Sequence, residues 1–163
     1  MKEPHLDAIG RRRPARQPVF DADNISPILF LTVCTAGRRR ILADAEIHGI
    51  LRGAWKMAEH WSVGRYVILP DHIHLFCAPA TQAITPVKKW VQYWKALVAR
   101  AWPRPDEQPI WQVDAWDTQL RKGESYSDKW AYVRENPVRH GLVRSPDDWP
   151  YQGEMNVLEW HDR

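Results

Sequence analysis

The sequence contains few cysteines and no long hydrophobic stretch. Cys34 and Cys77 are its two cysteines, and both lie in apolar segments typical of strands. We expect them to be buried free thiols in a reducing cytoplasm, because disulfide frameworks need more cysteines and an oxidising compartment. No apolar run is long enough to cross a membrane as a helix. The charged, proline-containing N-terminus does not have the apolar core of a signal peptide. These absences predict a cytoplasmic protein with no membrane partner.

Internal repeats and low-complexity segments are absent as well. Of the 163 residues, 44% are hydrophobic and 26% are charged, which is the balance of an ordinary globular domain. This length predicts one domain with a substantial core. The ten tryptophans are an unusual number for such a chain. We expect most of them in the core, although exposed tryptophans can stack on unpaired bases.

The excess of positive charge is modest, +3 at neutral pH, but it is clustered. Four clusters at the ends of predicted elements can line one groove and attract the phosphates of a nucleic acid. The alternative is that each cluster is a solvated loop. The clusters are Arg11, Arg12 and Arg13 with Arg16; Arg38, Arg39 and Arg40; Lys88 and Lys89; and Arg121 and Lys122.

The spacing of apolar residues predicts seven elements in the order β-α-β-β-α-β-α. This order is typical of the ferredoxin-like split-βαβ arrangement. We therefore expect an α+β fold, an antiparallel sheet with helices on one face and an appended helix that bears Tyr132. Gly64 is expected to end the first helix, Thr85 to cap the second and Ser125 to cap the third. The strands are expected at 28–35, 65–69, 72–77 and 117–120, and the helices at 44–60, 85–102 and 125–136.

Three parts of the chain are expected to differ in order. Residues 1–25 carry four arginines and three prolines, which predicts a flexible basic arm. Residues 26–151 are expected to form the folded catalytic domain. Residues 152–163 are expected to form an irregular C-terminal tail.

Two histidines separated by one residue are the first candidate for chemistry. Successive side chains of a strand point to opposite faces, so His72 and His74 share a face. Two adjacent imidazoles supply half of a metal site. Taken alone, the pattern is more typical of a polar pair on a solvent-facing strand.

A second candidate lies on the last predicted helix. Tyr132 and Asn136 are four residues apart and therefore share a helix face. Taken alone, Tyr132 is an ordinary half-buried helix tyrosine. A metal site together with a tyrosine nucleophile, however, can break a phosphodiester and hold one DNA end covalently. Chance produces the combination far less readily than either half.

The segments around these residues resemble those of a known family. The run LPDHIH at 69–74 and the run Tyr132-x-x-x-Asn136-Pro-Val-Arg at 132–139 resemble the single-tyrosine HUH transposases. Within them, the likeness is to the REP-associated tyrosine transposases, which act on repetitive extragenic palindromes. It extends from about Ile28 to Tyr151. Glu135 and His140 depart from the family pattern without replacing a presumed catalytic group.

This resemblance implies a nucleoid-associated, metal-dependent enzyme that nicks and rejoins single-stranded DNA at hairpins through a 5′-phosphotyrosine intermediate. It implies that Tyr132 is the nucleophile and that Asn136 joins His72 and His74 in binding Mg²⁺ or Mn²⁺. Asp71 either orients a histidine from behind or stabilises the turn. Arg139 either contacts phosphate or caps helix carbonyls. Both a monomer and a homodimer fit the family.

Two alternatives remain open from the sequence. The first is a catalytically silent protein that binds hairpin DNA without nicking it, although all the presumed catalytic positions are filled. The second is a zinc or iron His-x-His metalloenzyme, in which His140 or Glu135 supplies the third ligand.

Overall fold

The computed structural model describes residues 28–80, 85–119 and 125–158. The predicted basic arm, with Arg11, Arg12, Arg13 and Arg16, lies outside the described residues, as do Arg121 and Lys122. The strands are β1 (Leu29–Thr35), β2 (Trp61–Ile68), β3 (His72–Pro79), β4 (Trp111–Gln119) and β5 (Gln152–Glu154). The helices are α1 (Ala45–Met57), α2 (Val87–Ala101), α3 (Tyr126–Val133) and α4 (Asn136–Arg139), with 3-10 turns η2 (Ala36–Arg38), η3 (Pro105–Glu107) and η4 (Pro146–Asp148).

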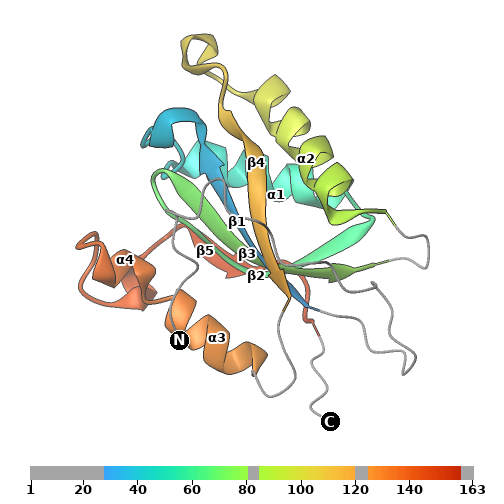
Figure 1. Cartoon of the computed structure of the whole chain (residues 1–163). Helices are drawn as coiled ribbons and strands as arrows, with labels where there is room; N and C mark the ends of the chain where they lie inside the picture. Colours follow the sequence, from blue (N-terminus) through green and yellow to red (C-terminus); the bar gives the residue numbers. More distant parts are fainter. Residues whose placement is uncertain (1–27, 81–84, 120–124, 159–163) are drawn as a thin grey trace.

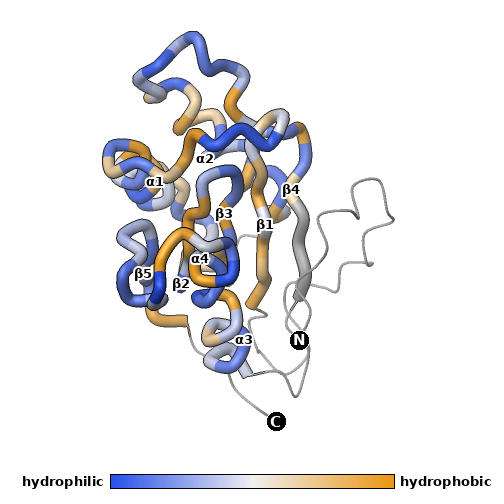
Figure 2. The backbone as a smooth tube through the Cα atoms, turned by 90° about the vertical axis from the view of Figure 1, so that its left-hand side faces the viewer, coloured by the Kyte–Doolittle hydropathy of each residue, from blue (hydrophilic) through white to orange (hydrophobic). Residues whose placement is uncertain are grey.

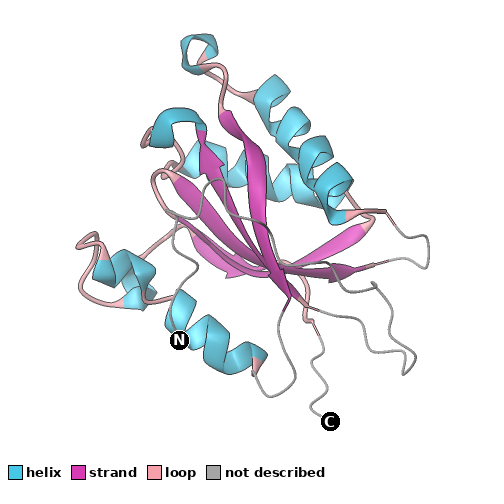
Figure 3. Cartoon of the chain, viewed as in Figure 1, coloured by secondary structure: helices cyan, strands magenta, loops and turns pink. Residues whose placement is uncertain are grey.

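The strands form one antiparallel sheet in the order β4-β1-β3-β2-β5 (Figure 1). β3 is central and pairs with β1 on one side and with β2 on the other. In the chain, α1 connects β1 to β2 and α2 connects β3 to β4 (Figure 3). The predicted α+β fold, an antiparallel sheet with packed helices, is therefore confirmed.

Helices cover both faces of the sheet (Figure 1), and each face has its own hydrophobic cluster. Ile73, Leu75 and Cys77 of β3 pack with α1 and α2 on one face. Phe76 points to the opposite face, where it packs with Tyr126 and Val133 of α3. Figure 2 shows hydrophobic residues along the central strands between these layers. Six tryptophans are buried in the described residues, which fits the expected core role.

Two of the three predicted helix starts are confirmed by their local contacts. Asp44 precedes α1, and its Oδ1 accepts hydrogen bonds from the backbone N–H groups of Glu46 (2.8 Å) and Ile47 (3.2 Å). Ser125 caps α3 by accepting from the N–H of Asp128 at 3.1 Å. Each cap satisfies donors that the first helical turn leaves without a partner.

The helical run that carries Tyr132 is interrupted before its predicted end. α3 stops at Val133 and α4 begins at Asn136. Pro137 has no N–H to donate to the carbonyl of Val133, so the ladder of hydrogen bonds breaks there and restarts with proline in the first turn. Tyr132 and Asn136 therefore lie on successive helical segments rather than on one continuous helix.

Two predicted boundaries are wrong. α1 ends at Met57, and Gly64 lies inside β2 next to an irregularity in its pairing with β3. A Cβ atom at Gly64 would lie 2.5 Å from Leu158 and 2.6 Å from the hydroxyl of Tyr126, so close packing requires the glycine. Thr85 does not cap α2, because Pro86 occupies the cap position; the Thr85 hydroxyl instead pairs with Nδ1 of His60 at 2.7 Å.

The outer strands extend beyond their predicted lengths. β4 begins at Trp111, six residues before the predicted start at 117, because it pairs with β1 along most of its length. The start of the C-terminal segment, expected to be irregular, forms β5 and pairs with β2. No helix in the described residues is long and apolar enough to span a membrane.

Candidate active site

β3 presents two buried imidazoles on the face of the sheet that α3 covers. His72 and His74 are each only 2% exposed. Their Nε2 atoms are 3.2 Å apart. His74 also stacks on Phe30 of β1, with ring centroids 5.2 Å apart. The strand alternation predicted from the sequence thus brings both histidines together, in a buried setting.

The other ring nitrogen of each histidine, Nδ1, is within hydrogen-bonding distance of a neighbouring side chain. Nδ1 of His72 lies 2.7 Å from Oδ1 of Asp71, and Nδ1 of His74 lies 3.0 Å from the hydroxyl of Thr32. A carboxylate only accepts, so the proton of His72 is on Nδ1. In the same tautomer, His74 donates to Thr32. Both Nε2 lone pairs then face each other, and a cation held between them would relieve their repulsion.

The distance between the two Nε2 atoms suits ligands of a single metal ion. Two donors that are each about 2.1 Å from an ion, at angles between octahedral and tetrahedral, are roughly 3.0–3.4 Å apart. The observed 3.2 Å falls within this range. A hydrogen-bonded carboxylate behind a ligating histidine is also usual at metal sites. The geometry of His72 and His74 therefore fits a divalent cation.

The protonation of His74 matches this role. Burial lowers the pKa of His74 well below its ordinary value. Electrostatic interactions with neighbouring groups lower it further, in the order His72, Lys129, His140 and Arg139. His74 is consequently neutral at physiological pH, which is the form that binds a metal.

Asp71 is fixed by an arginine of the first basic cluster. The Arg38 guanidinium contacts Oδ2 of Asp71 through Nε at 3.1 Å and through Nη2 at 2.9 Å. Gly37 and Arg38 have positive φ angles of 65° and 54°, and this left-handed turn carries the Arg38 side chain back toward β3. Burial alone would raise the pKa of Asp71, but its hydrogen bonds with His72 and Arg38 and the charge of Arg38 lower it to about 2. An ionised Asp71 therefore links Arg38 to His72.

The tyrosine and the asparagine approach the same face from α3 and α4. Tyr132 is half-buried and packs against the hydrophobic cluster that contains Phe30 and Phe76. Asn136 is fully buried. Its Oδ1 accepts a hydrogen bond from Arg139 Nη2 at 2.8 Å, and its Nδ2 has no hydrogen-bond partner among the described residues. A carbonyl oxygen has two lone pairs, so Oδ1 retains one with which to bind a cation.

Arg139 joins these two residues. Its Nη2 donates to the carbonyl of Tyr132 at 2.8 Å as well as to Asn136. Its guanidinium carbon lies 4.2 Å from the centroid of the Tyr132 ring, a cation–π contact. The predicted alternative of carbonyl capping is thus present in the structure, and the same side chain covers one face of the tyrosine ring.

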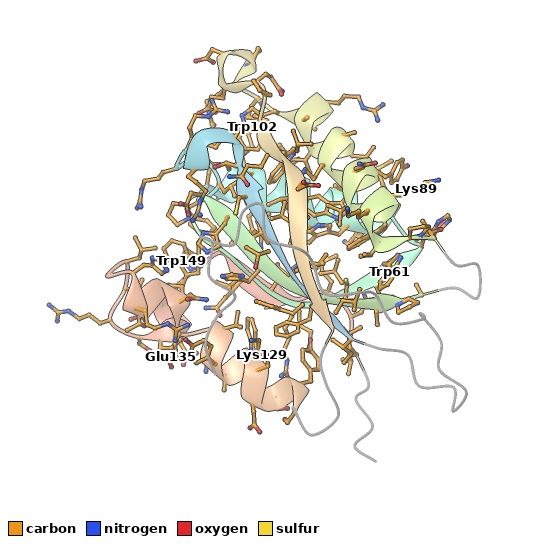
Figure 4. The ribbon with its side chains drawn as sticks, in the orientation of Figure 1. Trp61, Lys89, Trp102, Lys129, Glu135 and Trp149 are labelled. Carbon is orange, nitrogen blue, oxygen red and sulfur yellow. The ribbon has the colours of Figure 1, made fainter. Side chains whose placement is uncertain are left out.

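Among the described residues, Arg39, Lys88 and Lys89 of the basic clusters do not lie around the histidines. Arg39 donates to the backbone carbonyls of Ala36, Glu107 and Pro109, which makes it part of the turn structure. Lys88 and Lys89 are exposed on α2. Figure 4 shows Lys89 on the opposite side of the sheet from α3. The described clusters therefore do not line one groove together, and the clusters at 11–16 and 121–122 lie outside the described residues.

Within residues 28–80, 85–119 and 125–158, no third ligand of the zinc type is found. The described residues contain no group of three histidine, cysteine, aspartate or glutamate side chains arranged to hold a metal. The ring of His140 lies 6.1 Å from that of His72, centroid to centroid. The donor set of two imidazoles and an amide oxygen favours a weakly held ion over structural zinc.

Sequence patterns did not identify two residues beside the histidines. Thr32 faces His74 across β1 and β3, a pairing that depends on strand register. Lys129 is 6% exposed, and its ammonium lies 4.9 Å from the centroid of the Phe30 ring. The spacing of Tyr126, Lys129 and Val133 along one buried helix stripe was the available signal for this lysine.

Comparison with known proteins identifies relatives of the chain. No family model matches it. It is 25% identical over 127 residues to the REP-associated tyrosine transposase of Escherichia coli (strain K12), covering 75% of this chain and 73% of that protein. It is 30% identical over 115 residues to a protein of Haemophilus influenzae (strain ATCC 51907 / DSM 11121 / KW20 / Rd) with the name "Putative REP-associated tyrosine transposase", covering 61% of this chain and 64% of that protein. The chain is therefore similar to proteins named REP-associated tyrosine transposases.

The predicted resemblance to REP-associated tyrosine transposases is confirmed, and the relatives carry the name of the predicted enzyme class. The fold agrees with that of a solved REP-associated tyrosine transposase bound to a REP hairpin, with a TM-score of 0.62 and 23% identity. That match covers 77% of this chain and 75% of the solved chain.

Proposed function

We propose that this protein is a metal-dependent endonuclease and strand transferase that nicks and rejoins single-stranded DNA at hairpin elements. One observation carries the proposal: the paired Nε2 atoms of His72 and His74 and the Tyr132 helix lie on one face of the sheet. The kinship with REP-associated tyrosine transposases supports the same enzyme class. The hairpin in the solved relative supports hairpin DNA as the substrate.

His72, His74 and Asn136 would hold the ion. Mg²⁺ or Mn²⁺ suits three neutral ligands, because a DNA phosphate then supplies the negative charge that the protein does not. When bound, the ion polarises the phosphate and offsets the charge that develops during displacement. Asp71 and Thr32 keep the two imidazoles in the tautomer and orientation that this role requires.

Tyr132 would attack the phosphate in line with the departing 3′-oxygen. A bond forms between the phenol oxygen and phosphorus, and the bond from phosphorus to the 3′-oxygen breaks. The phenol proton is lost, and the 3′-oxygen gains a proton. The products are a 5′-phosphotyrosine and a free 3′-hydroxyl. No water is consumed, so another 3′-hydroxyl can reverse the step and join strands.

The test is to map the covalent bond. A hairpin oligonucleotide with single-stranded flanks is incubated with the protein and Mn²⁺, and the adduct is located by mass spectrometry of the digested protein. We expect an adduct on Tyr132 and a free 3′-hydroxyl on the other fragment. Tyr132→Phe should abolish both while leaving hairpin affinity almost unchanged, because the ring still packs and only the hydroxyl is removed.

A matched control is Tyr93→Phe, since Tyr93 is 48% exposed on α2, away from the site. This variant should cleave like the wild type. Cleavage by Tyr132→Phe at the wild-type rate would contradict the proposal. Binding of the hairpin by the wild type without any cleavage would favour the catalytically silent alternative.

A further inference from the structure

Arg38 has a backbone conformation that residues with a side chain rarely adopt. Its φ is 54°, directly after Gly37 with a φ of 65°. In this left-handed region the Cβ atom crowds the following backbone. Such a conformation persists only where surrounding contacts hold it, and it is often found at functional sites. Arg38 is the one non-glycine residue with a positive φ in the described residues, so the contacts of its side chain should explain it.

The side chain of Arg38 reaches one oxygen of the Asp71 carboxylate. Its Nε donates to Oδ2 at 3.1 Å, and its Nη2 lies 2.9 Å from the same oxygen. The other oxygen, Oδ1, lies 2.7 Å from Nδ1 of His72. The carboxylate is therefore shared, with one oxygen for the guanidinium and the other for the imidazole.

This sharing fixes the last free torsion of Asp71. The terminal torsion of an aspartate has broad minima, so a carboxylate held at one oxygen can rotate. Rotation would take Oδ1 away from Nδ1 of His72. The backbone of Asp71 is already tied, because its carbonyl accepts from the N–H of Thr35 at 3.0 Å and from the Thr35 hydroxyl at 3.2 Å. With the backbone held, the two contacts of Arg38 hold the carboxylate itself.

The arginine acts on His72 through Asp71 and not directly. Nη2 of Arg38 also lies 3.4 Å from Nδ1 of His72, and a guanidinium can only donate. The carboxylate contact is much shorter, 2.7 Å, and a carboxylate can only accept. The shorter contact decides the tautomer and places the proton on Nδ1. Nε2 of His72 is then left with its lone pair, 3.2 Å from Nε2 of His74.

We propose that Arg38 is a positioning residue, which holds the Asp71 carboxylate on Nδ1 of His72 and so keeps Nε2 available for a divalent cation. This inference rests on the proposed function and deepens it. Partners behind a ligating histidine fix its ring and raise its basicity. The competing role is a direct contact with DNA phosphate, because the Arg38 side chain is 30% exposed and belongs to a basic cluster.

The principal variant is Arg38→Met, which removes the guanidinium and keeps an unbranched side chain. Mn²⁺ binding is measured by electron paramagnetic resonance in the full chain with Tyr132→Phe, bound to a hairpin oligonucleotide, so that no cleavage takes place. The Mn²⁺ concentration at half-saturation should rise about 10-fold, the scale seen when partners of ligating histidines are removed. An unchanged half-saturation would overturn the proposal.

The matched control is Arg40→Met, because Arg40 is an exposed arginine of the same cluster. Loss of a positive charge by itself should leave Mn²⁺ binding unchanged or tighten it, since like charges repel. Weaker binding in Arg38→Met therefore has the opposite sign to a general charge effect. Equal weakening in both variants would show that Arg38 has no special role.

Asp71→Ala separates positioning from a phosphate contact. If Arg38 acts through Asp71, Arg38→Met should weaken Mn²⁺ binding little further in the Asp71→Ala background. Hairpin affinity without metal, and its decrease with salt, should stay close to the parent values in Arg38→Met. A phosphate contact predicts the full loss in both backgrounds, with lower hairpin affinity and a shallower salt dependence. That result would refute positioning.

The ring nitrogens of His72 report the positioning without any ion. Nitrogen NMR spectra of the ion-free protein, labelled at histidine, distinguish the two neutral tautomers, and His72→Ala identifies the signals. The parent should have its proton fixed on Nδ1, and Arg38→Met should show a mixture. A folded Arg38→Met that keeps the parent tautomer and loses only melting temperature would show a structural role alone. Arg38→Lys keeps one charged donor and should recover part of the Mn²⁺ affinity; no recovery would count against a charged donor on Oδ2.

The same measurements distinguish this inference from the proposed function. If the parent binds no Mn²⁺ that His74→Ala removes, the metal site of the proposed function fails, and the role of Arg38 fails with it. If the parent binds Mn²⁺ at the histidines and Arg38→Met binds it equally well, the proposed function stands and only the role of Arg38 fails.

Discussion

The two faces of the sheet are both buried, yet they are built from different residues. The face under α1 and α2 is filled by aliphatic side chains and tryptophans such as Trp90 and Trp94. The face under α3 also has a hydrophobic cluster, but the histidine pair, Lys129 and Asn136 are buried on the same side. One strand, β3, supplies both surfaces by simple alternation.

The two faces of this one strand therefore have different roles: one stabilises the fold, and the other carries the candidate active-site residues. Apolar side chains on the α1 and α2 face stabilise the fold by removing hydrocarbon from water. Polar side chains on the α3 face cost free energy to bury unless each one finds a partner. Asp71 and Thr32 meet that requirement for the histidines. Under the proposed function, the polar face would bind the ion and the phosphate, and burial of the apolar face would supply the stability that offsets its cost.

The largest effects should come from changing two adjacent residues of β3, one on each face of the sheet. His74→Ala should remove Mg²⁺- and Mn²⁺-dependent cleavage, because one of the two imidazole ligands is lost. The fold should be retained, since the apolar face is untouched. Cleavage of a hairpin oligonucleotide and the circular dichroism spectrum are the two measurements. Wild-type cleavage by a folded His74→Ala would show that the histidine pair does not hold a catalytic ion.

Much of this arrangement follows from local sequence patterns. The alternation of His72 and His74 with Ile73 and Leu75 has the period of a strand, and it correctly separates the two faces. The caps of α1 and α3 depend only on a polar side chain and on the backbone N–H groups of the helical turn that directly follows it. Such features depend on residues that are close in the chain, so sequence patterns can find them.

The parts that could not be predicted depend on contacts between distant segments. Thr32 meets His74 only because β1 pairs with β3 in one register. Gly64 resembles a helix stop in sequence, but its role comes from Leu158 and Tyr126, which are more than sixty residues away. β5 has three residues and includes a glycine, so it carries no recognisable pattern of its own. Arg38 resembles a surface charge until the turn brings it to Asp71.

The apolar face should respond in the opposite way to His74→Ala. Leu75 is fully buried in the cluster with α1 and α2. Leu75→Ala removes buried hydrocarbon and leaves a cavity, so the free energy of unfolding should fall by about 2–5 kcal/mol. Urea unfolding measures this loss. Cleavage, measured well below the melting temperature, should stay close to that of the wild type. A folded Leu75→Ala that no longer cleaves would show that the two faces are not independent.

The smallest expected effect concerns how α3 is attached to the sheet. Tyr126 is buried, and its hydroxyl accepts a hydrogen bond from the N–H of Arg65 at 2.8 Å, beside the irregularity in β2. Tyr126→Phe leaves this N–H without its partner, so the free energy of unfolding at neutral pH should fall by about 1–3 kcal/mol. Cleavage should survive if α3 keeps its position, because the ring still packs on Phe76.

The same residue gives a pH dependence with a definite sign. Burial raises the pKa of Tyr126 to about 12, against a partial opposing effect of the Arg65 hydrogen bond. The unfolded chain therefore loses this proton first, near pH 10, and the folded chain keeps it until about pH 12. Stability from the protonated phenol is complete below pH 10 and is lost as the pH rises through this interval. Urea unfolding at pH 9.5 and 11.5 should show a steeper loss for the wild type than for Tyr126→Phe. Parallel losses in the two proteins would mean that the Tyr126 phenol is not protected by burial, and that α3 is held less tightly to the polar face than its contacts indicate.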